Sequence, residues 1–458
     1  MTRTQWTIWL LASAGKFFEG YVVFMTGVAL PLIVAEFGLS SLEKGSVGAA
    51  PLAGILFGAS ALGALADRFG RKPLFILEMA LFAVCLLLLS LTPNLSWLLA
   101  VLFAMGLALG CDYPTAHMII SESISTSHRG RLVLSAFAFQ ALGALAGTAV
   151  GYVILLADAD IHVWRWMYAT AVLPAVIVAG ARFTIPQSPH WLVDQGRVNE
   201  AVTAIRRILS RRPQYPTRVV LTAVPKIKAD NGPRTSGLAA LFSRQHRRAA
   251  FLASLPWFLQ DLGTYGIGIF TPTILAAAIG SAETGRNLAS IIHNDMLAAK
   301  GAAFIDIPLI IGMICAVLLV DRIGRMKLQI AGFVGCALGL FLATLSFSVN
   351  EGARLPLIFA GFMLFNFMTN MGPNATTYVV AGEVFPTRIR GLGAGFAASA
   401  AKIGAVATAF LFPVLLKDIG TEILLWGLVG TSLLGALATW MLRIETMGRS
   451  LESLDTEP

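Results

Sequence analysis

The sequence predicts an all-α membrane protein with twelve transmembrane helices in two six-helix halves. Three observations support this fold class. Of the 458 residues, 56% are hydrophobic and only 13% are charged, whereas soluble domains carry about 25% charged residues. Twelve apolar runs recur along the chain, each close to the roughly 20 residues that span a bilayer as a helix. Short motifs also recur half a chain apart.

The twelve apolar runs are continuous, which predicts helices, since strands of a membrane barrel alternate apolar and polar residues. The first run is too long for a signal peptide and is interpreted as a retained helix. The runs begin near Ile8, Val47, Pro73, Trp97, Leu132, Val163, Ala249, Gly301, Lys327, Leu355, Gly391 and Ile423.

The net charge of +9 and the pI of about 9.6 reflect topology more than a nucleic-acid partner. Basic residues fall in every second loop, and thirteen lie between Arg182 and Arg248. By the positive-inside rule, both termini and the central loop face the cytoplasm of a multi-pass plasma-membrane protein. The four cysteines lie in apolar runs without metal-ligand spacing, and we expect neither a metal nor a cofactor.

Two pairs of motifs indicate an internal repeat. GALADRFGRK (Gly63–Lys72) follows the second run and VDRIGRMK (Val320–Lys327) follows the eighth, while Glu122 and Glu383 each precede an Arg-Gly pair by seven residues. Parallel halves around a midplane site are typical of secondary transporters. The predicted divisions are a first half over 1–185, a cytoplasmic linker over 186–248, a second half over 249–443 and a tail over 444–458.

These loop motifs resemble the signature of the major facilitator superfamily. PQSPHWLVDQGR (Pro186–Arg197) and IETMGRSLE (Ile444–Glu452) resemble elements of its sugar porters and related metabolite symporters. Acidic residues at helix ends beside arginines can latch neighbouring helices, and we expect them to stabilise the outward-facing state. The predicted cytoplasmic gate comprises Asp67, Arg68, Arg71, Glu122, Arg129, Asp321, Arg322, Arg325, Glu383 and Arg390.

The central loop is predicted to be a linker and not a domain. NEAVTAIRRIL (Asn199–Leu209) has apolar residues at helical spacing, which predicts a short surface helix. No phosphate loop, metal cluster or nucleophile motif accompanies it. An enzyme is therefore not expected.

Charged residues inside the runs are candidates for function, because each costs about 2.5 to 3.5 kcal/mol at a helix centre. Trp257, Asp261 and Tyr265 are spaced four residues apart and drift only about 80° around a helix, so they can face one lumen. Glu78 and Asp306 are weaker candidates, Asp306 because it is expected near a helix end. The charges inside the runs are Lys16, Glu19, Glu78, Asp112, Asp261, Asp306 and Lys402.

Several of these positions resemble the anion site of the phosphate:proton symporters of the superfamily. The matching positions, predicted to bind substrate, are Tyr113, Gln140, Trp257, Asp261, Tyr265, Asn374 and Lys402. The sequence departs from that family at Val101, where the fourth helix of the symporters carries an arginine. Lys16 is a possible replacement, as counter-ion to Glu19 or Asp112.

The predicted function is secondary active transport by alternating access, as proton-coupled uptake of a small polar, anionic solute. An apolar cavity disfavours an ionised carboxylate, so such a group can carry a proton. Asp112 is the first candidate for proton carrier, with Glu19 next, and Asp261 either carries the proton or binds substrate. The expected partners are substrate, proton and bilayer, for a functional monomer. The alternatives are a sugar or polyol porter, an uncoupled facilitator and an exporter.

Overall fold

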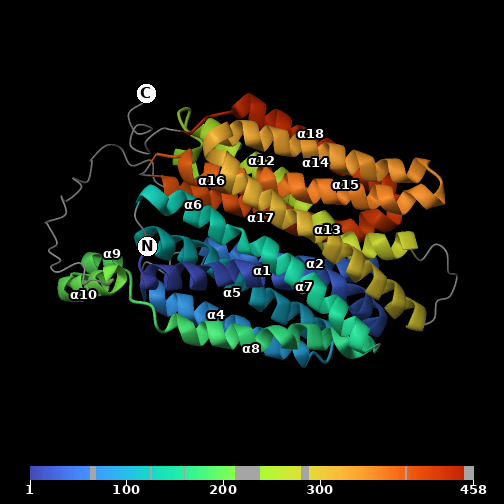
Figure 1. The fold of residues 1–458 in the computed structure, drawn as a ribbon, viewed down its shortest axis with the longest axis horizontal. Helices are drawn as coiled ribbons and strands as arrows, with labels where there is room; N and C mark the ends of the chain where they lie inside the picture. The colour runs from blue at the N-terminus through green and yellow to red at the C-terminus, as the bar shows by residue number, and fades with distance from the viewer. Residues whose placement is uncertain are drawn as a thin grey trace.

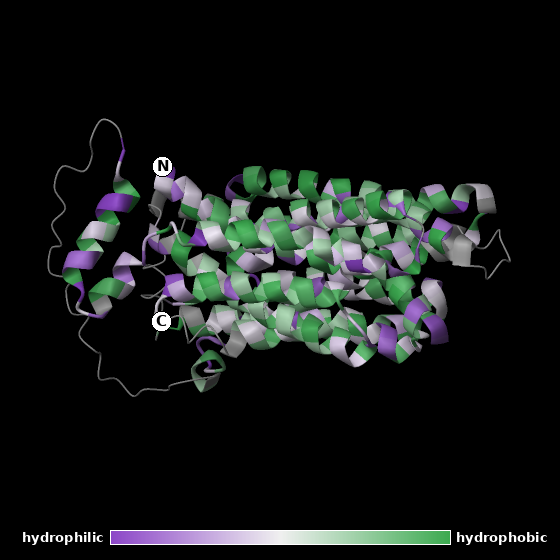
Figure 2. Cartoon of the chain, turned by 90° about the horizontal axis from the view of Figure 1, so that it is seen from below, coloured by the Kyte–Doolittle hydropathy of each residue, from purple (hydrophilic) through white to green (hydrophobic). Residues whose placement is uncertain are grey.

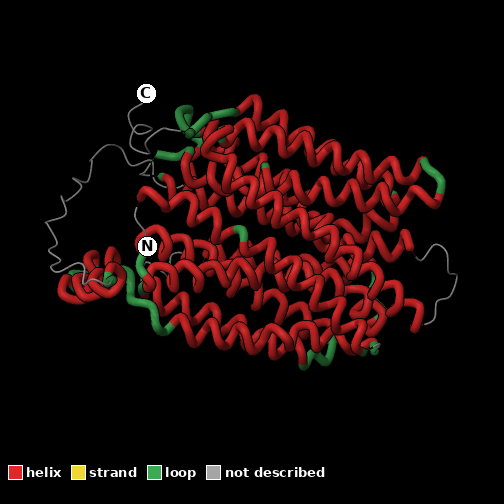
Figure 3. The backbone as a smooth tube through the Cα atoms, viewed as in Figure 1, coloured by secondary structure: helices red, strands yellow, loops and turns green. Residues whose placement is uncertain are grey.

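The computed structural model describes residues 1–61, 69–123, 126–158, 160–211, 238–279, 288–386 and 389–447. In these residues the chain is a bundle of long helices (Figures 1 and 3). The first half contains α1 (Arg3–Phe37), α2 (Ser41–Ala61), α4 (Arg71–Ser90), α5 (Leu95–Ser123), α6 (Thr126–Phe137), α7 (Phe139–Ala157) and α8 (Trp164–Arg182). The second contains α12 (Arg247–Ile279), α13 (Leu288–Ile323), α14 (Arg325–Leu345), α15 (Glu351–Met371), α16 (Pro373–Glu383), α17 (Arg390–Asp418) and α18 (Gly420–Leu442).

The predicted fold class is confirmed: the fourteen helices form twelve membrane spans in two six-helix halves. The fifth span is broken at Ala138 into α6 and α7, and the tenth is broken at Gly372 into α15 and α16. Proline at the first position of α16 suits a new helix, because its fixed backbone angle and missing N–H are tolerated there. Both breaks lie beside the cavity described below.

One predicted helix boundary is wrong. The eighth apolar run was placed from Gly301, but α13 begins at Leu288, so that the polar segment around Asp295 is helical. Asp306 therefore lies in the middle of a 36-residue helix and not near its end. The correction matters because it makes Asp306 a carboxylate at membrane depth.

The two halves lie side by side and pack mainly through three pairs of helices. In Figure 1 the first half is blue to green and the second is yellow to red. Across the interface α1 packs on α12, α2 on α17 and α7 on α13. The first residue lies at the same end of the bundle as α9 (Pro189–Asp194) and α10 (Val198–Leu209). We call this the linker end, and the opposite end the far end.

The outer surface of the bundle is apolar, as a lipid-facing surface requires. Large hydrophobic side chains such as Leu77, Trp166 and Leu318 are exposed, and Figure 2 shows hydrophobic residues over most of the bundle. By contrast α10 is amphipathic, as predicted, and buries Ala201, Ala204 and Ile208. Ten of the spans meet the length and hydropathy expected of a membrane helix. The chain is a multi-pass membrane protein.

Candidate functional site

The charged centre of the molecule joins the two halves. From α1 of the first half, the Lys16 ammonium contacts Glu19 at 2.9 Å. From α17 of the second half, Lys402 lies 3.4 Å from Asp261 and 3.7 Å from Glu19. All four side chains are buried. We call Lys16, Glu19, Asp261, Tyr265 and Lys402 the central network.

Tyr265 connects the members of the central network. Its hydroxyl donates to Glu19 at 3.2 Å and accepts from Lys402 at 2.5 Å. Two lysines and two carboxylates make the network formally neutral when all four groups are ionised. This pairing explains how four charges are buried at membrane depth, since an unpaired charge there is costly.

A cavity lies beside Tyr265 between the halves. Its walls come from α1, α6 and α7 of the first half and from α12, α13, α15 and α16 of the second. Amide and hydroxyl groups give it polar character within an otherwise apolar lining. The lining residues are Phe24, Phe137, Gln140, Ala141, Ala144, Thr264, Tyr265, Leu309, Met313, Asn370 and Asn374.

Asn374 is held in the cavity wall by a chain of amides. Its amide nitrogen donates to Asn370 at 2.5 Å, and its oxygen accepts from Gln260 at 3.3 Å. Asn370 in turn donates to the backbone carbonyl of Leu309 at 2.9 Å. The break before α16 places Asn374 at the second residue of that helix. These groups can donate to or accept from a polar solute.

The cavity is closed toward the linker end by an aromatic pair across the halves. The rings of Phe137 and Tyr378 stack with centroids 4.9 Å apart. Trp257 meets the Tyr378 ring edge-on at 6.1 Å, so it lies beside the pair. Phe137 lines both the cavity and a second pocket that Lys16 and Tyr378 also line. The Phe137–Tyr378 pair therefore separates these two spaces.

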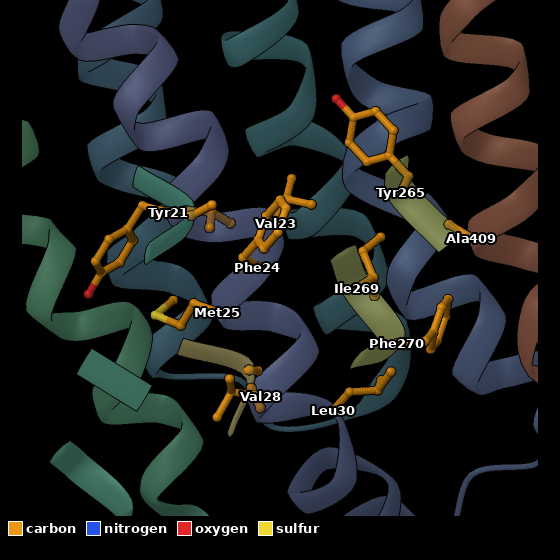
Figure 4. Packing of buried hydrophobic residues seen from close by; sticks show 14 of the residues in the cluster. Tyr21, Val23, Phe24, Met25, Val28, Leu30, Tyr265, Ile269, Phe270 and Ala409 are labelled. Atoms are coloured by element: carbon orange, nitrogen blue, oxygen red, sulfur yellow. The ribbon is translucent and has the colours of Figure 1, made fainter. Parts of the chain in front are cut away.

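Toward the far end, α1 and α12 close the cavity by close backbone approach. A Cβ atom on Gly27 would lie 2.3 Å from the carbonyl oxygen of Ile269, so only glycine fits there. Phe24 packs against the backbone at Gly268. Figure 4 shows Phe24 of α1 beside Ile269 of α12 across this contact. The two halves thus contact each other on both sides of the cavity, at Phe137–Tyr378 and at Gly27–Ile269.

A second charged cluster lies within the first half. Arg182, at the end of α8, is fully buried and donates to Asp112 at 2.7 Å and to Glu78 at 2.9 Å. It also donates to the carbonyl of Phe75 at 2.6 Å and lies over the Phe75 ring. We call Arg182, Asp112 and Glu78 the Arg182 cluster. Its partners all come from one half.

The Arg182 cluster corrects the sequence interpretation of two residues. Arg182 was counted with the basic residues of the central loop, but it is the counter-ion of Asp112 inside the bundle. Lys16 makes its ion pair with Glu19, the first of the two partners considered. Asp112 packs against α1 at Gly15, where a Cβ atom would meet its carboxylate. Asp112 and Asp261 thus belong to different clusters.

Gate residues of the described part pair within each half. Arg71 lies 3.5 Å from Glu122, which also accepts a hydrogen bond from Ser188. Arg325 bridges Asp321 at 3.0 Å and Glu383 at 3.1 Å. Arg322 is exposed. Asp67 and Arg68, and the side chains of Tyr113, Arg129 and Arg390, lie outside the residues that the structure describes.

The structure brings together most of the described residues predicted to bind substrate. Gln140, Tyr265 and Asn374 line the cavity, while Asp261 and Lys402 contact each other beside it. Sequence reasoning missed Asn370, Thr264 and Phe137 as lining residues. Asn370 lies four residues before Asn374, and Thr264 lies three residues after Asp261, so helical spacing from these predicted site residues could have indicated both. Phe137 lies three residues before Gln140 and could have been indicated in the same way.

Comparisons with known proteins agree with this architecture. The family model described as "Sugar (and other) transporter" matches residues 8–457. The chain is 28% identical to the putative metabolite transport protein YaaU of Escherichia coli, over 97% of this chain and 93% of that protein. It is 28% identical to the glucose transporter GlcP of Staphylococcus epidermidis, over 100% and 98%.

Further similarities extend to phosphate transporters and to a solved structure. The probable inorganic phosphate transporter 1-6 of Arabidopsis thaliana is 27% identical, over 100% of this chain and 96% of that protein. An inward-open structure of the xylose transporter XylE from E. coli superposes with a TM-score of 0.76, at 21% identity, over 98% of this chain and 99% of that chain.

Fold and sequence together define the class of the protein. Two six-helix halves around a buried polar centre, together with the match to the transporter family model, define a secondary transporter of the major facilitator superfamily. Since the family model spans nearly all of the sequence, the chain belongs to the sugar (and other) transporter family.

Proposed function

We propose that the protein takes up a small polar anion together with a proton by alternating access. The observation that carries this proposal is the central network, where Lys402 of the second half contacts Asp261, Tyr265 and Glu19. Glu19 comes from the first half, so the network must rearrange when the halves move apart. Its members therefore sense both the bound solute and the conformation.

Charge balance gives a physical basis for coupling. The network is formally neutral as it stands, so one added proton on Asp261 or Glu19 leaves one positive charge in excess. A monovalent anion beside Lys402 and Lys16 restores neutrality. Either ligand alone leaves a net charge in a buried site, which is unfavourable. Proton and anion are thus expected to bind with positive coupling.

The proposed solute contacts follow from the cavity lining. Lys402 and Tyr265 attract and orient the anion, and Gln140 and Asn374 supply amide hydrogen bonds. Tyr113 and Trp257 remain predicted members of the site. Organic acids and phosphate both fit this chemistry, and the similarity to phosphate transporters supports the second.

The proposed arrangement in the cell follows the charge pattern of the loops. We place the linker end, with both termini, on the cytoplasmic side of the plasma membrane. The pairs around Arg71 and Arg325 then lie on the cytoplasmic face, where each holds together helix ends of its own half. We propose the divisions at 185, 248 and 443 as the boundaries of the halves, and a functional monomer.

A sugar porter is the second candidate. The relatives GlcP and XylE are named for glucose and xylose transport, and amides such as Gln140, Asn370 and Asn374 suit sugar hydroxyls as well. The two buried lysines favour the anion, because a neutral sugar does not compensate an added proton.

The test is a ligand screen followed by uptake. Purified protein is heated with inorganic phosphate, benzoate, succinate, D-glucose and D-xylose, and ligands that raise the melting temperature are tested in proteoliposomes. We expect an anion to stabilise the protein and its uptake to need an inward proton gradient. Stabilisation by sugars alone would overturn the anion proposal, and gradient-independent uptake would overturn coupling.

A further inference from the structure

Asp306 differs from the other carboxylates discussed so far. It is 3% exposed, in the middle of α13, on the face that meets α7 of the other half. Glu19, Asp261, Asp112 and Glu78 each have a lysine or arginine within 4.0 Å. Among the described residues no lysine, arginine or histidine lies that close to Asp306.

The two partners of Asp306 are neutral. Its Oδ2 lies 3.1 Å from the Thr148 hydroxyl on α7, and its Oδ1 accepts from the Asn366 amide on α15 at 3.3 Å. A buried ionised carboxylate without a cation is unfavourable by several kcal/mol, whereas the protonated acid has no such cost. The surroundings of Asp306 therefore suit a carboxyl group that carries its proton.

The Thr148 hydroxyl has one hydrogen to donate, and three acceptor oxygens lie within hydrogen-bond distance of it. The carbonyls of Ala144 and Leu145 and the Asp306 carboxyl all lie 3.1 Å from it. If the carboxyl is protonated, it donates to Thr148, and Thr148 gives its own hydrogen to a carbonyl of its helix. An ionised Asp306 would have to take the Thr148 hydrogen for itself.

The position of the contact between Asp306 and Thr148 relates it to closing of the far end of the cavity. Leu309 follows Asp306 by one turn and Ala144 precedes Thr148 by one turn, and both line the central cavity. The contact lies on the far side of that cavity, because α7 runs from Phe139 toward the far end. A movement that opened the far end by separating α7 from α13 would break this contact and expose Asp306 to water.

We propose that Asp306 is a proton-binding site of the transport cycle, filled when the far end closes over it. External water supplies the proton to an Asp306 oxygen in the open state. On closing, the neutral carboxyl donates to Thr148, and on reopening the proton returns to the same water. The proton thus governs the closing step without setting the stoichiometry of transport. The inference rests on the proposed alternating access but not on the identity of the substrate.

The groups that surround Asp306 permit this assignment. Thr148 of α7 and Asn366 of α15 are the polar side chains that contact it, and neither titrates. The nearest carboxylate along its helix is Asp295, three turns toward the far end, whose oxygens lack a hydrogen-bond partner. The electrostatic interaction of Lys44 of α2 is with Asp295. A change in the charge of Asp306 therefore acts locally on the contact between the halves.

The first measurement is infrared spectroscopy of the purified wild type and Asp306→Asn at neutral pH. We expect the wild type to show a carbonyl band of a protonated carboxyl that the variant lacks. Equal carboxyl bands in the two proteins would overturn the proposal. This result needs no substrate, so it is informative even if the uptake tests of the preceding subsection fail.

The second measurement is exchange of labelled solute in proteoliposomes without a proton gradient, using phosphate, benzoate, succinate, glucose or xylose according to the ligand screen. Because closing binds a proton, wild-type exchange should fall about fivefold or more from about pH 6 to about pH 9. Asp306→Asn mimics the neutral acid and should flatten this profile. A variant with the wild-type profile would overturn the proposal.

A threonine pair provides the matched control. Thr148→Val removes the partner across the halves and should slow exchange at every pH. Thr271→Val removes a hydroxyl whose partner among the described residues is the Ile267 carbonyl of its own helix. Thr271→Val should leave exchange unchanged. Equal effects of the two valines would show that the Thr148 contact has no special role and would contradict the proposal.

Discussion

The central network and the Arg182 cluster bury the same kinds of charge in different ways. The central network joins the two halves through Glu19, Tyr265 and Lys402, whereas the Arg182 cluster lies within the first half. Rigid-body movement of the halves must break contacts of the first and can preserve those of the second. The location of a buried ion pair relative to the moving interface therefore indicates whether it can respond to the transport cycle.

The central network and the Arg182 cluster also differ in the balance of positive and negative charges. The central network is formally neutral, with two lysines and two acids, while Arg182 faces both Asp112 and Glu78. The Glu78 Oε2 and Asp112 Oδ2 atoms have no hydrogen-bond partner. Arg182 thus supplies one positive charge to two carboxylates, whereas each acid of the central network has a lysine within 4.0 Å. This leaves room for Asp112 in coupling even though it lies apart from the cavity.

The largest effect on transport is expected from Lys402→Met. Without Lys402 the central network holds one lysine and two acids, so a bound anion loses its attracting charge, at a cost of about 3 kcal/mol or a factor of about 100 in anion affinity. Uptake of the anion into proteoliposomes measures this loss of affinity. The double variant Lys402→Met with Asp261→Asn should recover the melting temperature but not the uptake. Uptake by the double variant at the wild-type rate would contradict a role of these residues in binding.

The largest effect on stability is expected from Arg182→Gln. It leaves two buried acids without a cation, at a cost of about 3 to 5 kcal/mol in the free energy of unfolding. Thermal unfolding in detergent should show a greater fall in melting temperature than for Lys402→Met. The comparison between the two regions breaks down if Lys402→Met is the more destabilising change.

Asp112→Asn sharpens the comparison by testing whether the Arg182 cluster takes part in coupling. As a proton carrier, Asp112 is required for accumulation against a gradient and not for exchange. We expect accumulation to be lost and counterflow to be spared. If accumulation survives, Asp112 is removed from the coupling role, and Asp261 and Glu19 remain.

A smaller effect is expected from Phe137→Ala. The shortened side chain opens a passage between the cavity and the pocket beside Lys16, because the stacked pair with Tyr378 separates them. Loss of one aromatic pair is worth about 0.5 to 1.5 kcal/mol, a few-fold change in the population of the closed state. Cysteine labelling from the linker side would measure how far this passage opens. Tyr378→Phe retains the stacked rings and should therefore open this passage less than Phe137→Ala does.

The sequence predicted the fold class and much of the central network. The repeated loop motifs indicated two halves, and the four-residue spacing of Trp257, Asp261 and Tyr265 predicted one shared face. Resemblance to the anion site of the phosphate:proton symporters added Lys402 to the predicted site, and the structure shows its contact with Asp261. Such patterns are local along a helix, and that is why they could be recognised.

The remaining features depend on pairings between distant segments. Arg182 ends an apolar run beside a basic loop, and nothing in its neighbours distinguishes a buried residue from a loop residue there. Asp306 was placed near a helix end because the polar residues around Asp295 interrupt the apolar pattern, although they continue α13. Partners such as Thr148 come from the other half, and a single sequence does not show them.

The most direct test of the account is the number of protons taken up when an anion binds. Purified protein in weak buffer with a pH indicator is titrated with benzoate or phosphate, according to the ligand screen, and compared with Asp261→Asn. The charge balance of the central network predicts about one proton taken up per anion bound by the wild type, and less by the variant. Anion binding without proton uptake would contradict the account.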